Sequence, residues 1–306
     1  MPTPLRLSLR QLQNFEAVAR TGSTRAASEE IALSQSATSG ALNELERLLG
    51  MQLFDRTGKR LLLNDNGREL LPRARALLDA ARGLEDLGKA AGPQLQWLRI
   101  GASTTVGTQL VPRLLAAFYG GEPRAAPHWR SKVAIANTAE ICAGVAAFEL
   151  DIGLIEGPSH DPALDVHPWV RDEMVVVASP RLADAGPARL GPRELREAVW
   201  LLREPGSGTR EVTDQVLLPH VRSYRRSIEL ASSEAIKKAA ALGLGHAVLS
   251  RWVAADLLAS GELREVRTVL PPISRQFYWV VHHEKGASAA LQRCLDLLQA
   301  GASVLG

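Results

Sequence analysis

The clearest helical pattern in the chain lies in residues 35–48. Spacings of four, four and three residues separate Ala37, Ala41, Leu45 and Leu48, which is typical of a helix with one buried face. Ser34 stands just before this segment and is a suitable N-cap, because its hydroxyl can accept a hydrogen bond from the first turn. The opposite face is polar and carries Gln35, Ser36, Ser39, Gly40, Asn43 and Arg47. The pattern predicts a helix with one apolar face and one slim, hydrogen-bonding face.

A shorter helix is expected immediately upstream, over residues 24–31, with Ala26, Ala27 and Ile31 on its apolar side. Its small residues would let the next helix cross closely. Two helices in this arrangement form a helix-turn-helix, whose second helix fits the DNA major groove and reads base edges with amide and hydroxyl groups. Any packed pair of amphipathic helices would show a similar pattern, so the next segment decides between the two interpretations.

Residues 49–67 contain two apolar runs around a cationic turn, which predicts a β-hairpin. The turn carries Arg56, Lys59 and Arg60. A basic hairpin, or wing, beside a recognition helix can hold the phosphate backbone without reading sequence. Next to the helix pair it favours DNA binding over an ordinary solvated turn. The residues expected to contact double-stranded operator DNA are Thr24, Arg25, Ser34, Gln35, Ser36, Ser39, Gly40, Asn43, Arg56, Lys59 and Arg60.

Residues 10–74 resemble the amino-terminal domain of LysR-type transcriptional regulators, nearly without gaps. The matching features are Phe15, Gly22-Ser23, Ala26-Ala27, Ser34-Gln35-Ser36-Ala37, Leu45-Glu46, Leu49-Gly50, Leu53-Phe54 and Arg56. The chain departs from the family pattern at Ser36, where the family often has proline, and at Gly40, where it has a large residue. Glycine inside a helix costs roughly 0.8–1 kcal/mol against alanine. Either the helix lies unusually close to DNA at Gly40, or a base contact used by relatives is absent.

A long helix is expected from Asn64-Asp65 to about residue 90. A heptad-like seam runs along it and consists of Leu70, Ala74, Leu77, Ala81 and Leu84. The seam could pack on its own domain, but two copies paired along it would present two recognition helices to successive half-sites. We therefore expect a homodimer through this linker helix, with a homotetramer as the alternative assembly. Gly92-Pro93 ends the helix and places a hinge at residues 88–94.

Strands and helices alternate from residue 93 onward, which predicts an α/β domain whose parallel sheets are covered by helices. The elements are too numerous for one short sheet, so we expect two Rossmann-like subdomains joined by crossovers near 157–172 and 268–274. This arrangement is similar to the effector domain of LysR-type regulators, which resembles type 2 periplasmic binding proteins. The predicted domains are a winged helix-turn-helix (1–64), a linker helix (65–92) and an effector domain (93–306), divided into subdomain I (93–166 and 270–306) and subdomain II (167–269).

Ligands of open parallel sheets bind at the carboxyl ends of the strands. Loops there carry hydroxyls and amides near predicted helix starts, where the helix dipole favours an anion. Each loop could also be explained by N-capping alone. The candidate effector-binding residues are Ser103, Thr104, Thr105, Asn137, Thr138, Ser207, Gly208, Thr209 and His246. In the family, the positions that match Ser103, Thr105, Asn137, Ser207 and Thr209 line the inducer cleft.

Residues 203–210, REPGSGTR, resemble the branch of the family that includes regulators of sulfur assimilation and carbon fixation. The inducers of that branch are small oxyanions or phosphorylated metabolites, so we expect a small anionic effector. Arg203 and Arg210 could supply charge to the site, or both could be solvated.

Composition limits the remaining functions. The chain has 306 residues, 46% of them hydrophobic, and a net charge of only +3, so DNA binding depends on local cations. No apolar run approaches the roughly 20 residues that cross a bilayer, and MPTPLRLSLR lacks a signal-peptide core. Cys142 and Cys294 are expected to be reduced core residues. A cytoplasmic protein without membrane contact is therefore predicted.

The sequence contains neither a metal-ligand spacing nor a nucleophile elbow, so we expect no enzymatic activity, no cofactor and no metal. The leading interpretation is a ligand-responsive transcription factor, with RNA polymerase as a further candidate partner. Two others stay open. One is an α/β solute-binding or enzymatic protein whose amino-terminal segment serves only for assembly. The other is an architectural DNA-binding protein with a vestigial pocket.

Overall fold

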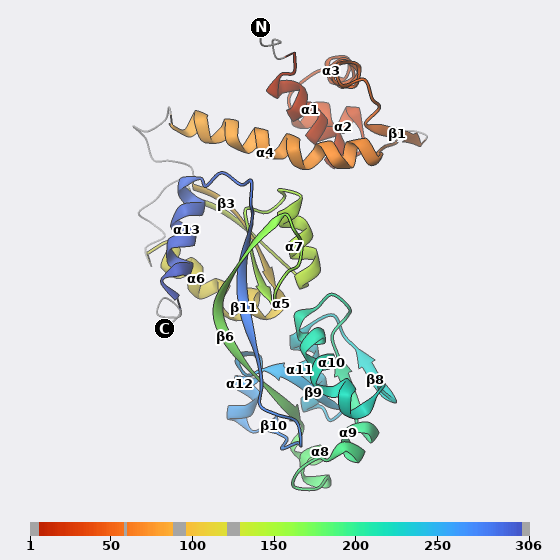
Figure 1. Ribbon diagram of the computed structural model, residues 1–306, viewed down its shortest axis with the longest axis vertical. Helices are drawn as coiled ribbons and strands as arrows, with labels where there is room; N and C mark the ends of the chain where they lie inside the picture. Colours follow the sequence, from red (N-terminus) through yellow and green to blue (C-terminus); the bar gives the residue numbers. More distant parts are fainter. Residues whose placement is uncertain (1–5, 58–59, 88–95, 121–128, 302–306) are drawn as a thin grey trace. The chain divides into compact units, whose positions relative to one another are not determined.

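The computed structural model describes residues 6–57, 60–87, 96–120 and 129–301 (Figure 1). The chain divides into two compact units. The first comprises Met1–Leu95, Ala147–Glu149 and Glu284–Ser288, and the second comprises Gln96–Ala146, Leu150–His283 and Ala289–Gly306. The predicted hinge at 88–94 lies outside the described residues.

Three helices, a hairpin and a long helix make up the first unit. Serine side chains cap each of the first three helices, which explains their sharp starts: Ser8, Ser23 and Ser34 each accept a hydrogen bond from an amide in the first turn. The elements are α1 (Leu9–Thr21), α2 (Thr24–Glu30), α3 (Gln35–Leu49), β1 (Phe54–Thr57), β2 (Arg60–Leu63) and α4 (Asp65–Leu87). Their shared core includes Phe15 and Phe54, whose rings meet edge to face at 5.6 Å.

The buried face of α3 differs from the predicted one. Thr38, Leu42 and Leu45 are buried, whereas Ala37 is exposed and Leu48 only half-buried. The two leucines on the buried face remove more apolar area from water than the two alanines of the predicted stripe, so the helix is rotated to bury them. The prediction of the apolar stripe was therefore wrong by about one residue, while the predicted polar face remains largely exposed.

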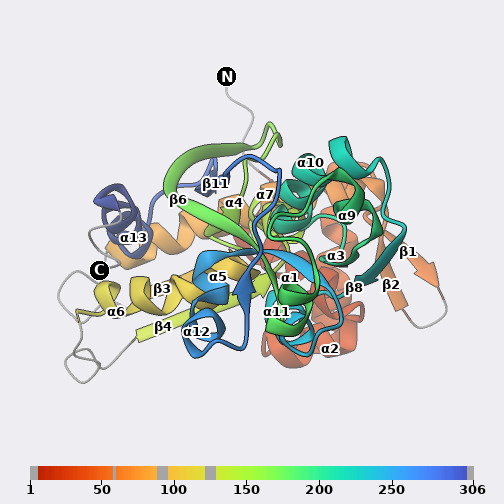
Figure 2. The same cartoon turned by 90° about the horizontal axis from the view of Figure 1, so that it is seen from below.

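One nine-stranded mixed sheet runs through the second unit in the order β4-β3-β5-β11-β6-β9-β7-β8, and β10 pairs with β6. Figure 2 shows β3 and β4 side by side. Parallel pairs lie towards its two ends, whereas β6 and β11 pair antiparallel with each other and with their other neighbours. The strands are β3 (Gln96–Ser103), β4 (Trp129–Ala136), β5 (Ile152–Glu156), β6 (Leu164–Ala178), β7 (Val199–Leu202), β8 (Arg226–Glu229), β9 (His246–Ser250), β10 (Arg264–Glu265) and β11 (Ile273–His282).

The first predicted crossover, 157–172, is largely strand rather than loop. β6 begins at Leu164, inside the segment that was expected to be a loop, because antiparallel pairing with β11 extends it. Polar residues along the first part of β6 hide this signal in the sequence. The helices are α5 (Thr104–Gln109), α6 (Val111–Phe118), α7 (Thr138–Ala146), α8 (Pro180–Ala185), α9 (Pro192–Glu197), α10 (Gly208–Val221), α11 (Ser233–Ala241), α12 (Arg251–Ser260) and α13 (Ala289–Gln299).

Cys142 and Cys294 are both free and buried, as predicted. Burial raises the pKa of Cys142 and raises the pKa of Cys294 to about 12, which keeps both thiols protonated at neutral pH. Among the described residues, none of the helices combines the length and the apolar composition that a membrane span requires.

Candidate functional site

The start of α3 presents a short polar surface. Ser34 Oγ accepts from the amide of Ala37 at 3.2 Å and lies 3.0 Å from Ser36 Oγ. Apart from half-buried Ser39, the side chains predicted to read DNA from this helix are exposed: Ser34, Gln35, Ser36, Gly40 and Asn43. A slim, exposed and hydrogen-bonding helix start is suited to the major groove.

The wing belongs to the same unit as this helix. Its strands pair from Phe54–Leu63 to Thr57–Arg60. The amide of Leu61 donates to the carbonyl of Gly22 at 2.9 Å, which ties the hairpin to the turn between α1 and α2. Arg56 and Arg60 are exposed, and Lys59 lies outside the described residues.

Two more predicted DNA contacts lie at the start of α2. Thr24 is half-buried at the first helical position. Arg25 is exposed and forms a 3.5 Å surface pair with Glu29. Such exposed pairs contribute little to stability, so Arg25 can exchange its partner for a phosphate.

Gly40 lies inside α3 with open space around it, since an added Cβ would meet nothing within 4 Å. Gly40→Ala is therefore expected to raise the free energy of unfolding of the first unit by about 0.8–1 kcal/mol. Thermal unfolding measures this change, and a gel shift with operator DNA then shows whether the helix approaches DNA too closely for a methyl group. Gly50→Ala is the matched control. Gly50 ends α3 with φ +70°, so alanine there is expected to destabilise the same unit.

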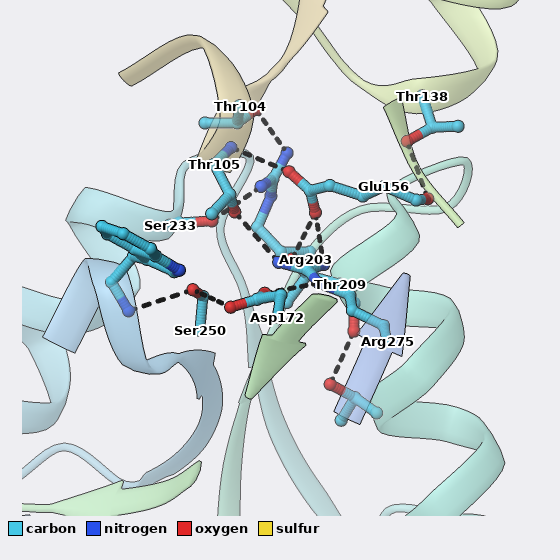
Figure 3. Close-up of polar contacts among 12 residues, drawn as sticks. Thr104, Thr105, Thr138, Glu156, Asp172, Arg203, Thr209, Ser233, Ser250 and Arg275 are labelled. Atoms are coloured by element: carbon cyan, nitrogen blue, oxygen red, sulfur yellow. Dashed lines mark hydrogen bonds and ion pairs between the residues drawn. The ribbon is translucent and has the colours of Figure 1, made fainter. Parts of the chain in front are cut away.

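A buried ionic cluster lies at the carboxyl ends of several strands in the second unit (Figure 3). Arg275 of β11 contacts Glu156, the last residue of β5, through Nη1. Its Nε donates to Asp172 Oδ2 of β6 at 2.8 Å. All three side chains are at most 2% exposed. Arg275 and Asp172 are register partners in the pairing of β11 with β6, so their ion pair links these two strands.

Groups from two of the predicted effector loops, together with the hydroxyl of Ser250, complete this cluster. Glu156 accepts from the amide of Thr105 and from Thr209 Oγ1, both at 2.8 Å. Asp172 accepts from Ser250 Oγ at 2.7 Å. The structure therefore brings Thr105 and Thr209 together, as the sequence led us to expect, but uses both of them to hold a buried carboxylate (Figure 3).

The two carboxylates of the cluster differ in their protonation. Burial opposes ionisation of Glu156, but Arg275 and hydrogen bonds from Thr209 and Thr105 outweigh it and lower the pKa of the Glu156 carboxyl. Burial dominates at Asp172 and raises the pKa of that carboxyl, against the influence of Arg275 and Ser250. One guanidinium cannot fully compensate two buried carboxylates. Glu156 accepts hydrogen bonds from more protein groups than Asp172 does, so Glu156 is the one that stays ionised more readily.

Arg203 forms a second buried cationic centre in the same unit. Its side chain is 2% exposed, which rules out the alternative that Arg203 is solvated. Nε and Nη2 donate to the two carboxylate oxygens of Glu204, both at 2.8 Å. Nη1 donates to Ser233 Oγ at 2.9 Å and Nη2 to Thr104 Oγ1 at 3.1 Å (Figure 3). Burial opposes ionisation of Glu204, but the hydrogen bond from Arg203 lowers the pKa of its carboxyl.

The remaining predicted residues surround these two centres. Asn137 Oδ1 caps α7 through the amide of Glu140 at 2.9 Å, and Thr138 Oγ1 donates to the carbonyl of Glu156 at 3.3 Å. Ser103 is buried and its Oγ has no hydrogen-bond partner. Ser207 is buried at the start of α10, where its side chain makes no capping hydrogen bond.

His246 does not belong to this group. It is the first residue of β9, whereas Ser250 at the far end of the same strand contacts the ionic cluster. Four residues of strand separate the two by about 13 Å. Instead, the His246 ring lies 5.9 Å from the Trp200 ring, and burial lowers the pKa of His246. Leu244-Gly245-His246 precedes its strand, whereas the loops of Thr105 and Thr209 follow theirs, so the structure does not bring His246 to the ionic cluster and its role in effector binding stays a prediction.

Sequence reasoning missed several residues of the site. Glu156 carried a usable signal, since a carboxylate directly after a buried apolar strand is unusual. Asp172 carried none, because it lies in the segment 157–172 that was expected to be a crossover loop. Arg275 carried none either, because nothing in the predicted strand around it indicates that its charge is buried. Glu204 and Ser233 were not singled out, because a glutamate beside an arginine and a serine at a predicted helix start are both common in solvated surfaces and caps.

One group of described residues offers metal-ligand atoms close together. His282, His283 and Glu284 each provide one such atom, and these lie within 4.8 Å of one another. His283 Nδ1, however, lies 2.9 Å from the carbonyl oxygen of Ala163. These contacts give no reason to assign a metal, and the absence of a metal site stays a prediction.

A winged helix-turn-helix unit followed by an α/β unit with polar loops at its strand ends defines the class of ligand-responsive DNA-binding regulators. The chain belongs to the LysR family. Residues 9–68 match the bacterial regulatory helix-turn-helix protein, lysR family, and residues 91–303 match the LysR substrate binding domain. The protein is therefore a LysR-type DNA-binding transcriptional regulator with an effector-binding domain, and the predicted resemblance and fold class are confirmed.

Named relatives agree with this assignment. The chain is 43% identical over 293 residues to the uncharacterized HTH-type transcriptional regulator YeiE of Escherichia coli K12, covering 95% of this chain and 97% of that protein. It is 33% identical to the HTH-type transcriptional regulator CbbR of Rhodospirillum rubrum, over 96% of each chain. The regulatory domain of Synechocystis PCC6803 CcmR in complex with 2-PG is 29% identical, with a TM-score of 0.58, and covers 67% of this chain and 96% of that domain.

Proposed function

We propose that the exposed start of α3 reads operator bases and that the wing holds the phosphate backbone. The observation that supports this division is the contrast in side chains. The helix start carries short amide and hydroxyl groups, whereas the wing carries the exposed guanidinium groups of Arg56 and Arg60. Hydrogen-bonding side chains on base edges specify sequence, and cations on phosphates supply affinity.

Gln35→Ala is expected to weaken operator binding by about 1–3 kcal/mol and to relax sequence preference, with little change in nonspecific affinity. Arg56→Ala is expected to weaken both kinds of binding and to reduce the salt slope by about one. Gel shifts over a salt series, with operator and scrambled DNA, separate the two. Arg264→Ala is the control, because Arg264 is an exposed, paired arginine with no predicted DNA contact. Equal effects of Gln35→Ala and Arg56→Ala would contradict the division of roles.

We further propose that the protein acts as a homodimer formed through α4, or as a tetramer built from such dimers. Leu77 and Leu84 of the predicted seam are 54% and 70% exposed, which supports an unfilled apolar surface on this helix. Ala74 of the same seam is buried in the core of the first unit, so only part of the seam is available. Sedimentation equilibrium of the full chain measures the assembly directly.

The effector, in our proposal, is a small anion bound among the loops at the strand ends of the second unit. Support comes from the buried guanidinium of Arg203 at these loops and from the relative whose regulatory domain was solved with 2-PG. The named relatives are transcriptional regulators, which favours control of transcription in the cytoplasm over enzymatic activity.

A salt-titrated gel shift on upstream DNA, with sulfate, phosphate or 2-PG added, tests this function. Specific binding that changes with an anion supports a ligand-responsive regulator. Specific binding that no anion changes favours an architectural protein, and no binding at low salt favours an α/β protein whose first unit serves only for assembly. A ligand can alter DNA binding only if it binds two states of the protein with different affinity.

A further inference from the structure

Three arginines lie beside the loops of the proposed effector site, and their partners differ in how readily they can be replaced. Arg275 is held by two carboxylates that are at most 1% exposed, so moving either would leave a buried charge without compensation. Arg210 is held by Asp214 on the same helix, with Nε 3.0 and 2.9 Å from the two oxygens, and also contacts Glu229. Arg210 is itself 21% exposed and therefore already solvated, and Asp214 is also held by a hydrogen bond from Tyr224 Oη at 2.6 Å. Arg275 and Arg210 are therefore poorer candidates for an anion site than a fully buried guanidinium with one movable partner.

Arg203 differs from both. Its two-pronged partner is the adjacent residue, Glu204, whose side chain is 19% exposed while that of Arg203 is 2% exposed. Rotation about the Glu204 side-chain bonds would move its carboxylate into water, where the charge is solvated and needs no protein partner. The guanidinium would stay in place, because Ser233 and Thr104 hold its other edge through hydrogen bonds of 2.9 and 3.1 Å.

We propose that the Glu204 carboxylate is an internal competitor that occupies the effector position on Arg203, and that an effector oxyanion displaces it. This inference rests on the proposed anion site and adds its mechanism. A carboxylate bound through both oxygens to a guanidinium fork has the geometry by which sulfate, phosphate and carboxylate ligands bind arginine. The glutamate therefore marks both the position and the orientation of the ligand oxygens.

Competition also selects the ligand by charge. A monovalent ligand binds Arg203 no more favourably than the Glu204 carboxylate that it must displace. The carboxylate also has the advantage of a high effective concentration, because it is tethered to the adjacent residue. A divalent oxyanion gains additional Coulombic attraction in this poorly solvated position. The expected effector class is therefore a divalent oxyanion, either inorganic or a phosphate monoester, in preference to chloride or acetate.

Isothermal titration of the full chain with sulfate and with phosphate tests the proposal. Glu204→Gln keeps the size of the side chain but removes the competing charge, and it is expected to tighten sulfate and phosphate binding at least tenfold. Asp214→Asn is the matched control. It removes a carboxylate from Arg210 in the same unit and is expected to change affinity less than twofold. Adding Arg203→Gln to the Glu204→Gln variant is expected to abolish the gain.

The outcomes separate this proposal from the proposed function. If the wild type binds an anion and Glu204→Gln binds it no more tightly, Glu204 is not a competitor, although the anion site stands. If neither protein binds sulfate or phosphate, the Arg203 position is not an anion site, and the gel shift decides the function independently. An equal gain in Asp214→Asn would attribute the effect to general electrostatics and overturn the proposal. If circular dichroism shows that Glu204→Gln does not fold, Glu204→Asp is the second variant. Its shorter side chain draws the carboxylate away from Arg203, and it is expected to tighten anion binding by a smaller factor.

Discussion

Replacing Arg275 with methionine is expected to lower the free energy of unfolding of the second unit by about 3–5 kcal/mol. The variant keeps the volume of the side chain but leaves Glu156 and Asp172 buried without a cation. Urea denaturation of the full chain, followed by tryptophan fluorescence, measures the loss. The expected size exceeds that of any surface substitution because no water can replace the missing guanidinium.

The pH dependence of this variant gives a second test. Without Arg275, both carboxyls are expected to have folded-state pKa values above their unfolded-state values. Such groups stabilise the fold only while they are protonated, so the deficit of the variant should be small near pH 4 and grow as the pH rises to 8. Arg251→Met is the control, since it removes an exposed partner of Glu173 and Glu265 and is expected to cost less than about 1 kcal/mol at every pH. A deficit that does not depend on pH would contradict the electrostatic explanation.

Gly208→Ala is the second substitution with a large expected effect. A Cβ at this position would lie 2.0 Å from the carbonyl oxygen and 2.6 Å from the Cβ of Glu156. The backbone of Glu156 cannot rotate out of the way as a flexible side chain can, so the start of α10 must shift away from the end of β5. We expect a loss of about 3 kcal/mol, the upper part of the range for overpacked cores.

The same movement would withdraw Thr209 from Glu156, where its hydroxyl now donates at 2.8 Å. The variant should therefore lose its response to anions in the gel shift as well as its stability in thermal unfolding. Gly40→Ala, the same chemical change inside a helix with open surroundings, is expected to act in the opposite direction. Stabilisation by both substitutions would show that the close approach at Gly208 is not a constraint.

Local chemistry explains why much of this molecule could be predicted. Ser34 caps α3 because its hydroxyl lies within three residues of the amide that it accepts from, and β7 and β9 are short apolar runs that need no distant information. The loops that bring Thr105 and Thr209 to Glu156 were found by the rule that ligands bind after parallel strands. The same rule explains why His246, which lies before its strand, does not reach the ionic cluster.

Distant pairing could not be predicted in the same way. Asp172 and Arg275 are 103 residues apart and meet only because two crossover strands pair in one register. Nothing near either residue in the sequence indicates that its charge is buried. The rotation of α3 has a similar origin, since the face that becomes buried depends on which side chains α1 offers as a packing surface.

The buried charges of Glu156, Asp172 and Arg275 also have an evolutionary consequence. Loss of the arginine alone would remove about 3–5 kcal/mol from a fold whose total stability is typically about 5–15 kcal/mol. Single-step drift at these positions is therefore opposed, and descendants are expected to keep all three residues or to exchange them together. Among relatives, these three positions are therefore expected to change together, whereas exposed ion pairs such as Arg251–Glu173 are expected to vary independently.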